Sequence, residues 1–282
     1  MHRSRAVLRL VVAGLVAAPV VSWVTMPPPS AAAAPTIVTI EWHDGNADQI
    51  GTLQILHDHG VRATFLVNTG PILAGDPEKL SVSQLEALFA DGNEIAGHTL
   101  DHVNVQPLPI ADARNEVCAD RNNLLAMGFQ PTSLAYPFAS FDAGSEDVAH
   151  YCNYNGASAT AGLTLKGPAA NTVPPGDPYA VRTVPAIKKS TKLGTMEKYI
   201  LAAEAAAQTD GSAWTILVFH HLCEAHCGPY VISAAKFAAF LDFLAAEAPN
   251  GVVVETMQQV IGGSIRGPCD PVTGTGCDTT PR

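Results

Sequence analysis

Apolar and polar residues alternate in blocks along most of the chain. Short, nearly continuous apolar runs are typical of buried strands, and they cover 36–40, 61–67, 95–97, 133–136, 156–160, 180–185, 214–220 and 252–254. Between them, apolar residues recur at spacings of three and four, which predicts helices over 47–59, 82–89, 110–127, 145–151, 196–207, 233–246 and 256–261. This alternation predicts an α/β fold with parallel strands inside and helices outside, as a closed or nearly closed barrel. The spacing alone also permits an open, doubly wound sheet.

Polar residues with metal-binding chemistry follow two of these runs. Asp44 comes where the first strand breaks into a loop, and His98 and His102 lie four residues apart just after the run 95–97. One carboxylate and two imidazoles form a three-ligand set that leaves a position open for water, as a catalytic zinc requires. Taken separately, Asp44 and Gly45 also suit a simple turn, and the histidines an ordinary loop.

Two further segments complete a recognisable order of motifs. The run 134–138 reads Leu-Ala-Tyr-Pro-Phe, and the apolar run 216–219 ends in His220. In this order the segments resemble the polysaccharide deacetylases of carbohydrate esterase family four. That family has a strand ending in Thr-Phe-Asp-Asp-Gly, then His-Ser/Thr-x-x-His, an aromatic-Pro-aromatic loop, and an apolar strand ending in His. The resemblance covers most of the chain after about Thr36 and is most specific over 98–102.

The resemblance implies a fold, a metal site and a reaction. The fold is a distorted (β/α) barrel of about seven parallel strands. Asp44, His98 and His102 would bind a divalent metal, with zinc as the expected ion, and His220 would be the general acid that protonates the departing group. The reaction would be hydrolysis of N- or O-acetyl groups on a polysaccharide such as chitin-like oligomers, peptidoglycan or xylan.

The aromatic loop carries a supporting role and a departure from the family. By resemblance, Tyr136, Pro137 and Phe138 line the substrate groove and offer a backbone N–H to the oxyanion. Ala135 stands where many members carry an Arg that positions the catalytic Asp. Arg182, at an expected strand end, is the candidate to replace that Arg.

The first motif departs further, because His43 stands where the family has the Asp that acts as general base. Glu41 and Trp42 replace Thr and Phe beside it. His43 could itself be the base, and because residues 41 and 43 share one face of a strand, Glu41 could orient the imidazole. Glu41 could also reach in as the base, or the base could be missing, which would leave a carbohydrate-binding relative.

The first residues have the layout of a secretory signal peptide. Arg3, Arg5 and Arg9 precede an apolar stretch over 10–24, and alanines over 31–34 offer a cleavage site. We therefore expect a signal peptide over 1–34, a catalytic domain over 35–263 and a cysteine-containing tail over 264–282. The mature protein would be secreted and free of the membrane, although an uncleaved anchor is the competing interpretation.

The six cysteines all lie beyond this leader, as expected for three disulfides in an oxidising compartment. Pairing near neighbours gives Cys223–Cys227 and Cys269–Cys277, which leaves Cys118–Cys152. A metal site at Cys223 and Cys227 is the alternative, because His226 lies between them.

Charge and composition narrow the partners. A net charge of −10 argues against nucleic acid and against an anionic membrane surface, and it permits a neutral or cationic glycan. We expect a monomer with a loop over or beside the site at 162–177. A metal amidohydrolase acting on a small, non-glycan amide is the remaining alternative function.

Overall fold

The computed structural model describes residues 34–224 and 228–282. The expected signal peptide therefore lies outside the described residues, apart from Ala34. The described chain from Ala34 onward is one compact unit.

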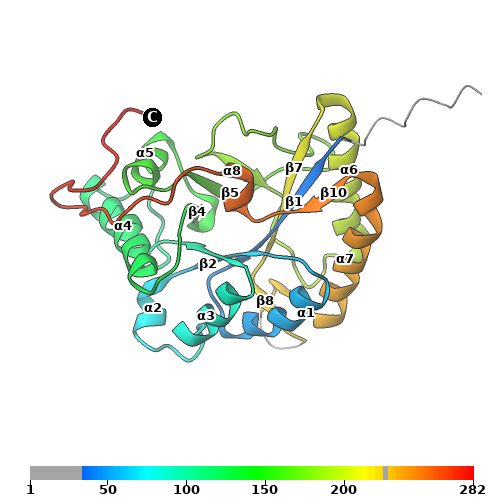
Figure 1. Ribbon diagram of the computed structural model, residues 1–282, viewed down its shortest axis with the longest axis horizontal. Helices are drawn as coiled ribbons and strands as arrows, with labels where there is room; N and C mark the ends of the chain where they lie inside the picture. The colour runs from blue at the N-terminus through cyan, green and yellow to red at the C-terminus, as the bar shows by residue number, and fades with distance from the viewer. Residues whose placement is uncertain (1–33, 225–227) are drawn as a thin grey trace, which may run out of the picture. The chain divides into compact units, whose positions relative to one another are not determined.

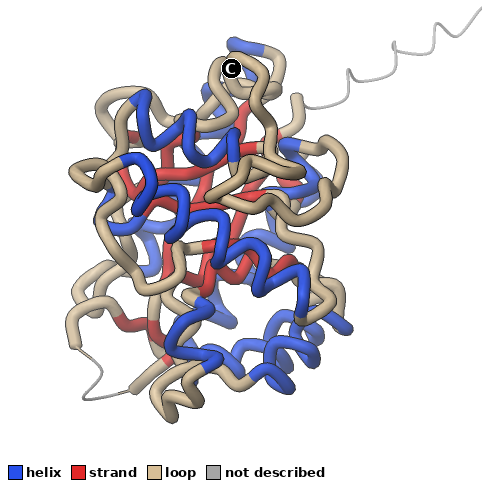
Figure 2. The backbone as a smooth tube through the Cα atoms, turned by 90° about the vertical axis from the view of Figure 1, so that its left-hand side faces the viewer, coloured by secondary structure: helices blue, strands red, loops and turns tan. Residues whose placement is uncertain are grey.

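A sheet of parallel strands runs through the centre of this unit, with helices around it (Figures 1 and 2). Its strands are β1 (Thr36–His43), β2 (Thr64–Val67), β3 (Glu94–Gly97), β4 (Ser133–Tyr136), β5 (Gly156–Gly162), β6 (Val181–Thr183), β7 (Ala213–Phe219) and β10 (Val252–Val254). They pair in the order β10-β1-β2-β3-β4-β5-β6, and β7 pairs with the other edge of β1. Every pair is parallel, as the alternating pattern predicts.

The segment after β6 closes the sheet against β7. Val184 N–H donates to the carbonyl of Ile216 at 3.0 Å, and Ile187 N–H donates to that of Val218 at 2.8 Å. The predicted distorted barrel of about seven parallel strands is confirmed, with β10 as a short addition beside β1.

Helices surround the sheet: α1 (Thr52–Asp58), α2 (Thr69–Leu73), α3 (Val82–Ala90), α4 (Ile110–Ala126), α5 (Ala143–Tyr151), α6 (Leu193–Asp210), α7 (Ala234–Glu247) and α8 (Met257–Ile261). Helices α6 and α7 lie together on one side and α4 with α5 on the other (Figure 1). Short 3₁₀ turns occur at η1 (Ala47–Gly51), η2 (Pro137–Ala139) and η3 (Ala248–Asn250). The helix expected over 47–59 is therefore η1 followed by α1.

Strand β1 is buried along its whole length, and its two faces differ. Trp42 points toward α7 and is fully buried. Its ring stacks on Phe219 of β7 and meets the edge of Phe237 of α7, both at centroid distances of 5.2 Å. Glu41 and His43 point the other way, and Glu41 reaches Ser158 on β5, which does not pair with β1. The odd-numbered side chains at the end of β1 therefore face the barrel interior.

The tail after Gly263 is fixed by polar contacts as well as by cysteines. The buried guanidinium of Arg121 on α4 donates to the carbonyls of Arg266 and Gly267, at 2.7 and 2.9 Å. Disulfides Cys118–Cys152 and Cys269–Cys277 are present, and Cys118 Sγ lies 3.5 Å from Cys269 Sγ. For the third expected pair, Cys227 lies outside the described residues.

The loop over 162–177, which we expected over or beside the site, is anchored at Asn171. Asn171 forms an antiparallel bridge with Trp214 at the start of β7, the end of that strand away from His220. In this bridge the backbone N–H of Asn171 donates to the carbonyl of Trp214, and the N–H of Trp214 donates to the carbonyl of Asn171. The backbone polar groups of Asn171 are therefore satisfied.

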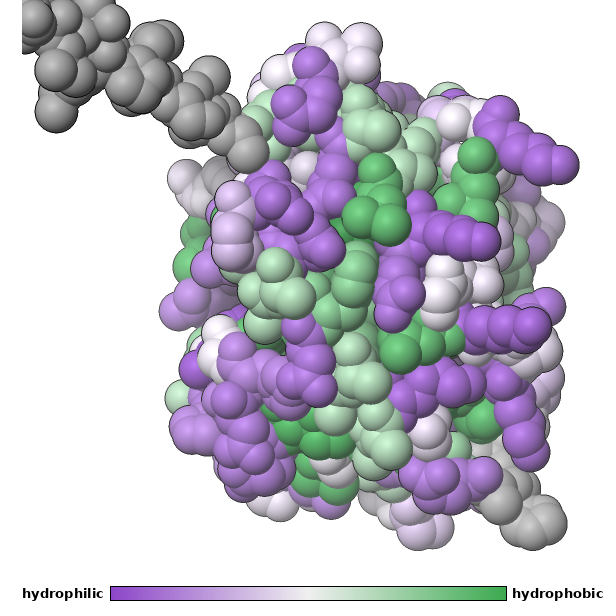
Figure 3. All heavy atoms as spheres, turned by 90° about the vertical axis from the view of Figure 1, so that its right-hand side faces the viewer, coloured by the Kyte–Doolittle hydropathy of each residue, from purple (hydrophilic) through white to green (hydrophobic). Residues whose placement is uncertain are grey.

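On the side of α6 and α7, hydrophilic side chains are mixed with scattered hydrophobic ones (Figure 3). Leu201 on α6, for example, is 46% exposed. Within the described ranges, none of the helices combines the length and the hydrophobicity needed to cross a bilayer.

Candidate active site

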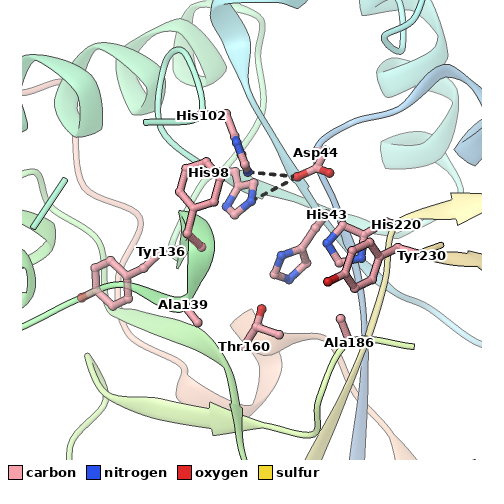
Figure 4. A pocket seen from close by; sticks show the side chains of 11 residues that line it. His43, Asp44, His98, His102, Tyr136, Ala139, Thr160, Ala186, His220 and Tyr230 are labelled. Atoms are coloured by element: carbon pink, nitrogen blue, oxygen red, sulfur yellow. Dashed lines mark ion pairs between the residues drawn. The ribbon is translucent and has the colours of Figure 1, made fainter. Parts of the chain in front are cut away.

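The carboxyl ends of the barrel strands converge on one cavity of about 450 Å³. Asp44 follows β1, His98 follows β3, Thr160 lies on β5 and His220 follows β7. Figure 4 shows the side chains of Asp44, His98, His102, His43 and His220 gathered around this space. Parallel strands end at the same edge of a barrel, so residues far apart in sequence meet there.

Asp44, His98 and His102 form one cluster in which the candidate ligand atoms all lie within 4.8 Å of one another. Asp44 Oδ1 lies 3.4 Å from His98 Nε2 and 3.2 Å from His102 Nε2. Among the described residues this is the one such group of histidine, cysteine and carboxylate side chains.

The protonation of His98 shows that the cluster fits a cation. Its Nδ1 lies 2.8 Å from the carbonyl oxygen of Ala135, which can only accept, so Nδ1 carries the proton. A neutral His98 then presents a bare Nε2 lone pair to Asp44 Oδ1, which is buried and accepts no hydrogen bond from the described residues. Two acceptors that face each other are stabilised by a positive charge between them, so the donor set fits a divalent metal.

Strained backbone positions this cluster. Asp44, Thr99 and His102 adopt φ values of 74°, 67° and 54°, a left-handed region that costs non-glycine residues on the order of 1–3 kcal/mol each. The neighbouring carbonyls of His98 and Thr99 both accept hydrogen bonds from Asn68 Nδ2. Strain of this kind persists when surrounding contacts determine the conformation, and it is concentrated at functional sites.

A buried carboxylate holds the His98 segment from behind. Asp120 on α4 accepts from the backbone N–H of His98 at 3.0 Å and from that of Thr69 at 2.9 Å. Burial raises the pKa of Asp120 to about 7, although these hydrogen bonds lower it in part. The sequence pattern gave no reason to select Asp120, because its two partners are backbone groups of distant segments.

His43 is paired with Glu41 inside the barrel. His43 Nε2 lies 2.8 Å from Glu41 Oε2, and Ser158 Oγ donates to Glu41 at 3.0 Å. Both side chains are nearly inaccessible to solvent. The ring of His43 lines the cavity. Because its Nε2 is engaged with Glu41, Nδ1 is the ring nitrogen that has no hydrogen-bond partner among the described residues. Glu41 itself does not line the cavity, so it can act only through His43.

Burial dominates the titration of these groups. It raises the pKa of Glu41 to about 8, against the opposing effect of the Ser158 hydrogen bond, and it lowers the pKa of His43 well below its usual value. In the metal-free protein at neutral pH, Glu41 and His43 therefore form a neutral pair.

His220 lines the same cavity, beside His43 and Tyr230. Its ring centroid is 5.5 Å from that of His43 and 5.1 Å from that of Tyr230. Burial lowers the pKa of His220 to about 4, so this ring is neutral before reaction.

The aromatic loop divides into a buried and an exposed part. Tyr136 is buried at the cavity edge, where its hydroxyl donates to the carbonyl of Tyr179 at 3.1 Å, and Pro137 is also buried. Phe138 is 68% exposed at a φ of 60°, and its ring lies 4.7 Å from that of His102. Phe138 is therefore the residue of this loop that can meet a ligand at the cavity mouth.

The expectation for Arg182 is wrong. Val181 and Thr183 point into the protein, so the alternation of β6 turns Arg182 outward, where it is exposed and absent from the cavity lining. Its aliphatic carbons pack against Gly162. Among the described residues no arginine contacts His43, whose ring is paired with Glu41, and Glu41 in turn accepts a hydrogen bond from Ser158.

Tyr230, Thr160 and Ala186 line the cavity and were not expected there. Figure 4 shows Tyr230 beside His220, with Thr160 and Ala186 on the side away from His102. Tyr230 precedes the short strand β9 (Val231–Ile232), which pairs with β8 (His221–Leu222). Neither two-residue strand has a sequence signal, so this placement could not be predicted.

Comparison with known proteins agrees with the barrel fold. Residues 35–157 match the family model described as polysaccharide deacetylase. This part of the chain, somewhat less than half of it, is therefore similar to polysaccharide deacetylases. No curated protein matches the sequence.

Solved structures share the fold at low sequence identity. A family 4 acetyl xylan esterase from Clostridium thermocellum, in complex with a cobalt ion, has a TM-score of 0.52 at 15% identity over 84% of this chain and 96% of that one. The chitin deacetylase of Colletotrichum lindemuthianum has a TM-score of 0.51 at 21% identity, over 82% and 89%. A mutant of BA3943, described as a family pseudoenzyme with restored activity, has a TM-score of 0.51 at 12% identity, over 81% and 68%.

Proposed function

We propose that this protein is a secreted, metal-dependent deacetylase that hydrolyses N- or O-acetyl groups of a polysaccharide. The observation that carries the proposal is the pair of facing acceptors, Asp44 Oδ1 and His98 Nε2, in a cavity also lined by His43 and His220. The signal-peptide pattern over 1–34 and the disulfides Cys118–Cys152 and Cys269–Cys277 support secretion.

Asp44, His98 and His102 would hold the ion, with zinc as the best match to one carboxylate and two imidazoles. When bound, such an ion supplies Lewis acidity to the acyl carbonyl and acidifies the attacking water. His98 is kept in the required tautomer by the Ala135 carbonyl.

His43 is the proposed general base. When its Nε2–H donates to ionised Glu41, Nδ1 keeps its lone pair and can accept the proton of the attacking water. Glu41 then stabilises the imidazolium that forms, and Ser158 stabilises the ionised Glu41 by donating to it.

His220 is the proposed general acid, which delivers a proton to the departing amine or alkoxide. Its low pKa makes its protonated form a strong acid. Because the ring is neutral before reaction, it first takes up this proton from solvent water, as the negative charge that develops on the acyl group raises its proton affinity.

The test is acetate release from N-acetylglucosamine oligomers, peptidoglycan and acetylxylan, with added zinc and with a chelator as control. We expect release from at least one polymer that chelation abolishes and zinc restores. Release that survives complete chelation would contradict metal dependence.

A catalytically impaired carbohydrate-binding relative is the second candidate. It is favoured by His43, which stands where the family has Asp, and by the likeness to a protein described as a pseudoenzyme. Binding of these polymers without acetate release, at zinc concentrations that saturate the site, would favour this candidate.

A further inference from the structure

The backbone ladder that joins β1 to β7 stops just short of the two proposed proton-transfer residues. The strands pair in register from Thr36 with Ala213 to Trp42 with Phe219. His43 and His220 are the next residues on each strand, and their ring centroids lie 5.5 Å apart. A contact other than the regular ladder must therefore fix the spacing of these two strand ends.

The side chain of Gln49 makes that contact. Its Nε2 donates to the carbonyl of His43 at 2.5 Å and to the carbonyl of His220 at 2.7 Å. Asn46 Nδ2 adds a third, longer hydrogen bond to the carbonyl of His220, at 3.2 Å. Because both carbonyls can only accept, the amide nitrogen and not the amide oxygen must face them.

Packing alone does not explain an amide at this position. Gln49 is completely buried, and its Oε1 has no hydrogen-bond partner in the part of the chain that the structure describes. A buried acceptor left unpaired is unfavourable, so an apolar side chain of the same size would satisfy packing better. What the amide adds is the bridge between the two carbonyls.

The metal cluster has a separate support. Lys79 Nζ donates to the carbonyl of Asp44 at 3.0 Å, and Asp120 holds the backbone of His98. Gln49 contacts neither of these groups, so its loss should disturb the two histidines at the strand ends more than the ligand set.

We propose that Gln49 is a positioning residue that forms the last rung between β1 and β7 and thereby sets the spacing of His43 and His220. The meaning of this spacing for catalysis rests on the proposed function, whereas the rung itself does not. Gln49 acts through the two histidines, because it does not line the cavity.

Two substitutions separate the bridge from packing. Gln49→Met keeps the approximate length and volume but removes the donor, and Gln49→Glu keeps the shape but cannot donate to two carbonyls when ionised. Gln54→Met on α1 is the matched control, because Gln54 is exposed and, among the described residues, donates only to Asp58, at 2.7 Å.

With the polymer that releases acetate in the panel, both Gln49 variants should lower kcat by about 10–100-fold, the usual effect of a displaced catalytic group. KM and the dissociation constant for Zn²⁺ should stay within about threefold of the wild-type values, because the ligand set is supported separately. Gln54→Met should match the wild type in all three quantities. Full kcat in Gln49→Met would overturn the proposal, as would a loss of zinc affinity as large as the loss of kcat.

If the wild-type protein releases no acetate, the proposed function fails while the rung stays testable. The imidazole ¹⁵N chemical shifts of His43 and His220 should then change in Gln49→Met and not in Gln54→Met. Unchanged shifts for both rings in Gln49→Met would overturn the rung.

Discussion

The two halves of the site are built in different ways. The metal cluster lies on loops, where Asp44 and His102 have left-handed backbones and Asp120 and Asn68 hold the chain from behind. The proton-transfer half lies on straight strand ends, where buried side chains hold His43 and His220. The first half keeps the residues of the pattern that the chain resembles, whereas the second keeps His220 and has His43 in place of the Asp base. Ligand geometry therefore constrains a sequence more tightly than the identity of the base, since a base needs only a proton affinity and a position.

The largest effect should come from the metal half. His98→Ala removes a buried ligand and leaves Asp44 Oδ1 and the Ala135 carbonyl without this partner. We expect zinc affinity and acetate release to fall by more than the roughly 100-fold typical of an outer-shell change. Zinc titration and the acetate assay measure this, with the exposed His57 changed to Ala as the control. Tight zinc binding in His98→Ala would mean that the ligands are elsewhere.

Loss of His43 should separate the two halves. His43→Ala removes the proposed base but no ligand, so acetate release should fall by about 10²–10⁴-fold while zinc affinity stays nearly unchanged. The same two assays apply, with His59→Ala on the far end of α1 as the control. Wild-type turnover in His43→Ala would contradict the role of His43 as the base.

The sequence predicted the features that depend on local pattern. Apolar runs place the parallel strands, and strand ends place Asp44, His98 and His220 at one edge of the barrel, whatever the details of packing. Helix α2 is missing from the expected elements because Gly70 and Pro71 suggest a break, although Pro is tolerated in the first turn of a helix.

Features that depend on the phase of a strand or on distant contacts could not be predicted. A shift of one residue in β6 decides whether Arg182 points inward or outward, and a three-residue strand carries too little pattern to fix it. Gln49 and Asp120 matter through hydrogen bonds to the backbone of distant segments, which leave no periodic signal. The tail likewise offers only its cysteines in sequence, whereas Arg121 fixes it from another element.

A smaller effect is expected from the support behind the ligands. Asp120→Asn replaces one of two accepting oxygens with a donor that would face a backbone N–H of His98 or Thr69. Zinc affinity should fall by about 10–100-fold, as for other outer-shell partners. Isothermal titration compares it with Asp112→Asn, an exposed change on the same helix. Equal affinities in the two variants would show that the loop holds its ligands without Asp120.

The smallest effect should be a pH-dependent change in stability from Glu41. Burial raises the pKa of this carboxyl from 4.5 to about 8, so the folded, metal-free protein keeps a proton that the unfolded chain releases. The contribution of Glu41 to the free energy of unfolding is therefore largest below about pH 4.5 and falls as pH rises toward 8. Glu41→Gln stays neutral at every pH, so relative to this variant the wild type should lose on the order of a few kcal/mol between pH 5 and pH 8.

Urea unfolding of the wild type and of Glu41→Gln, both in the presence of a chelator that removes metal, measures this difference at several pH values. Burial also raises the pKa values of Glu94 and Asp120, but their contributions are the same in both proteins and cancel in the comparison. Parallel curves for wild type and Glu41→Gln would show that Glu41 is ionised in the folded protein at neutral pH. His43 would then carry its proton on Nε2 before any metal binds, and the proton-transfer half would be preorganised in the same way as the metal half.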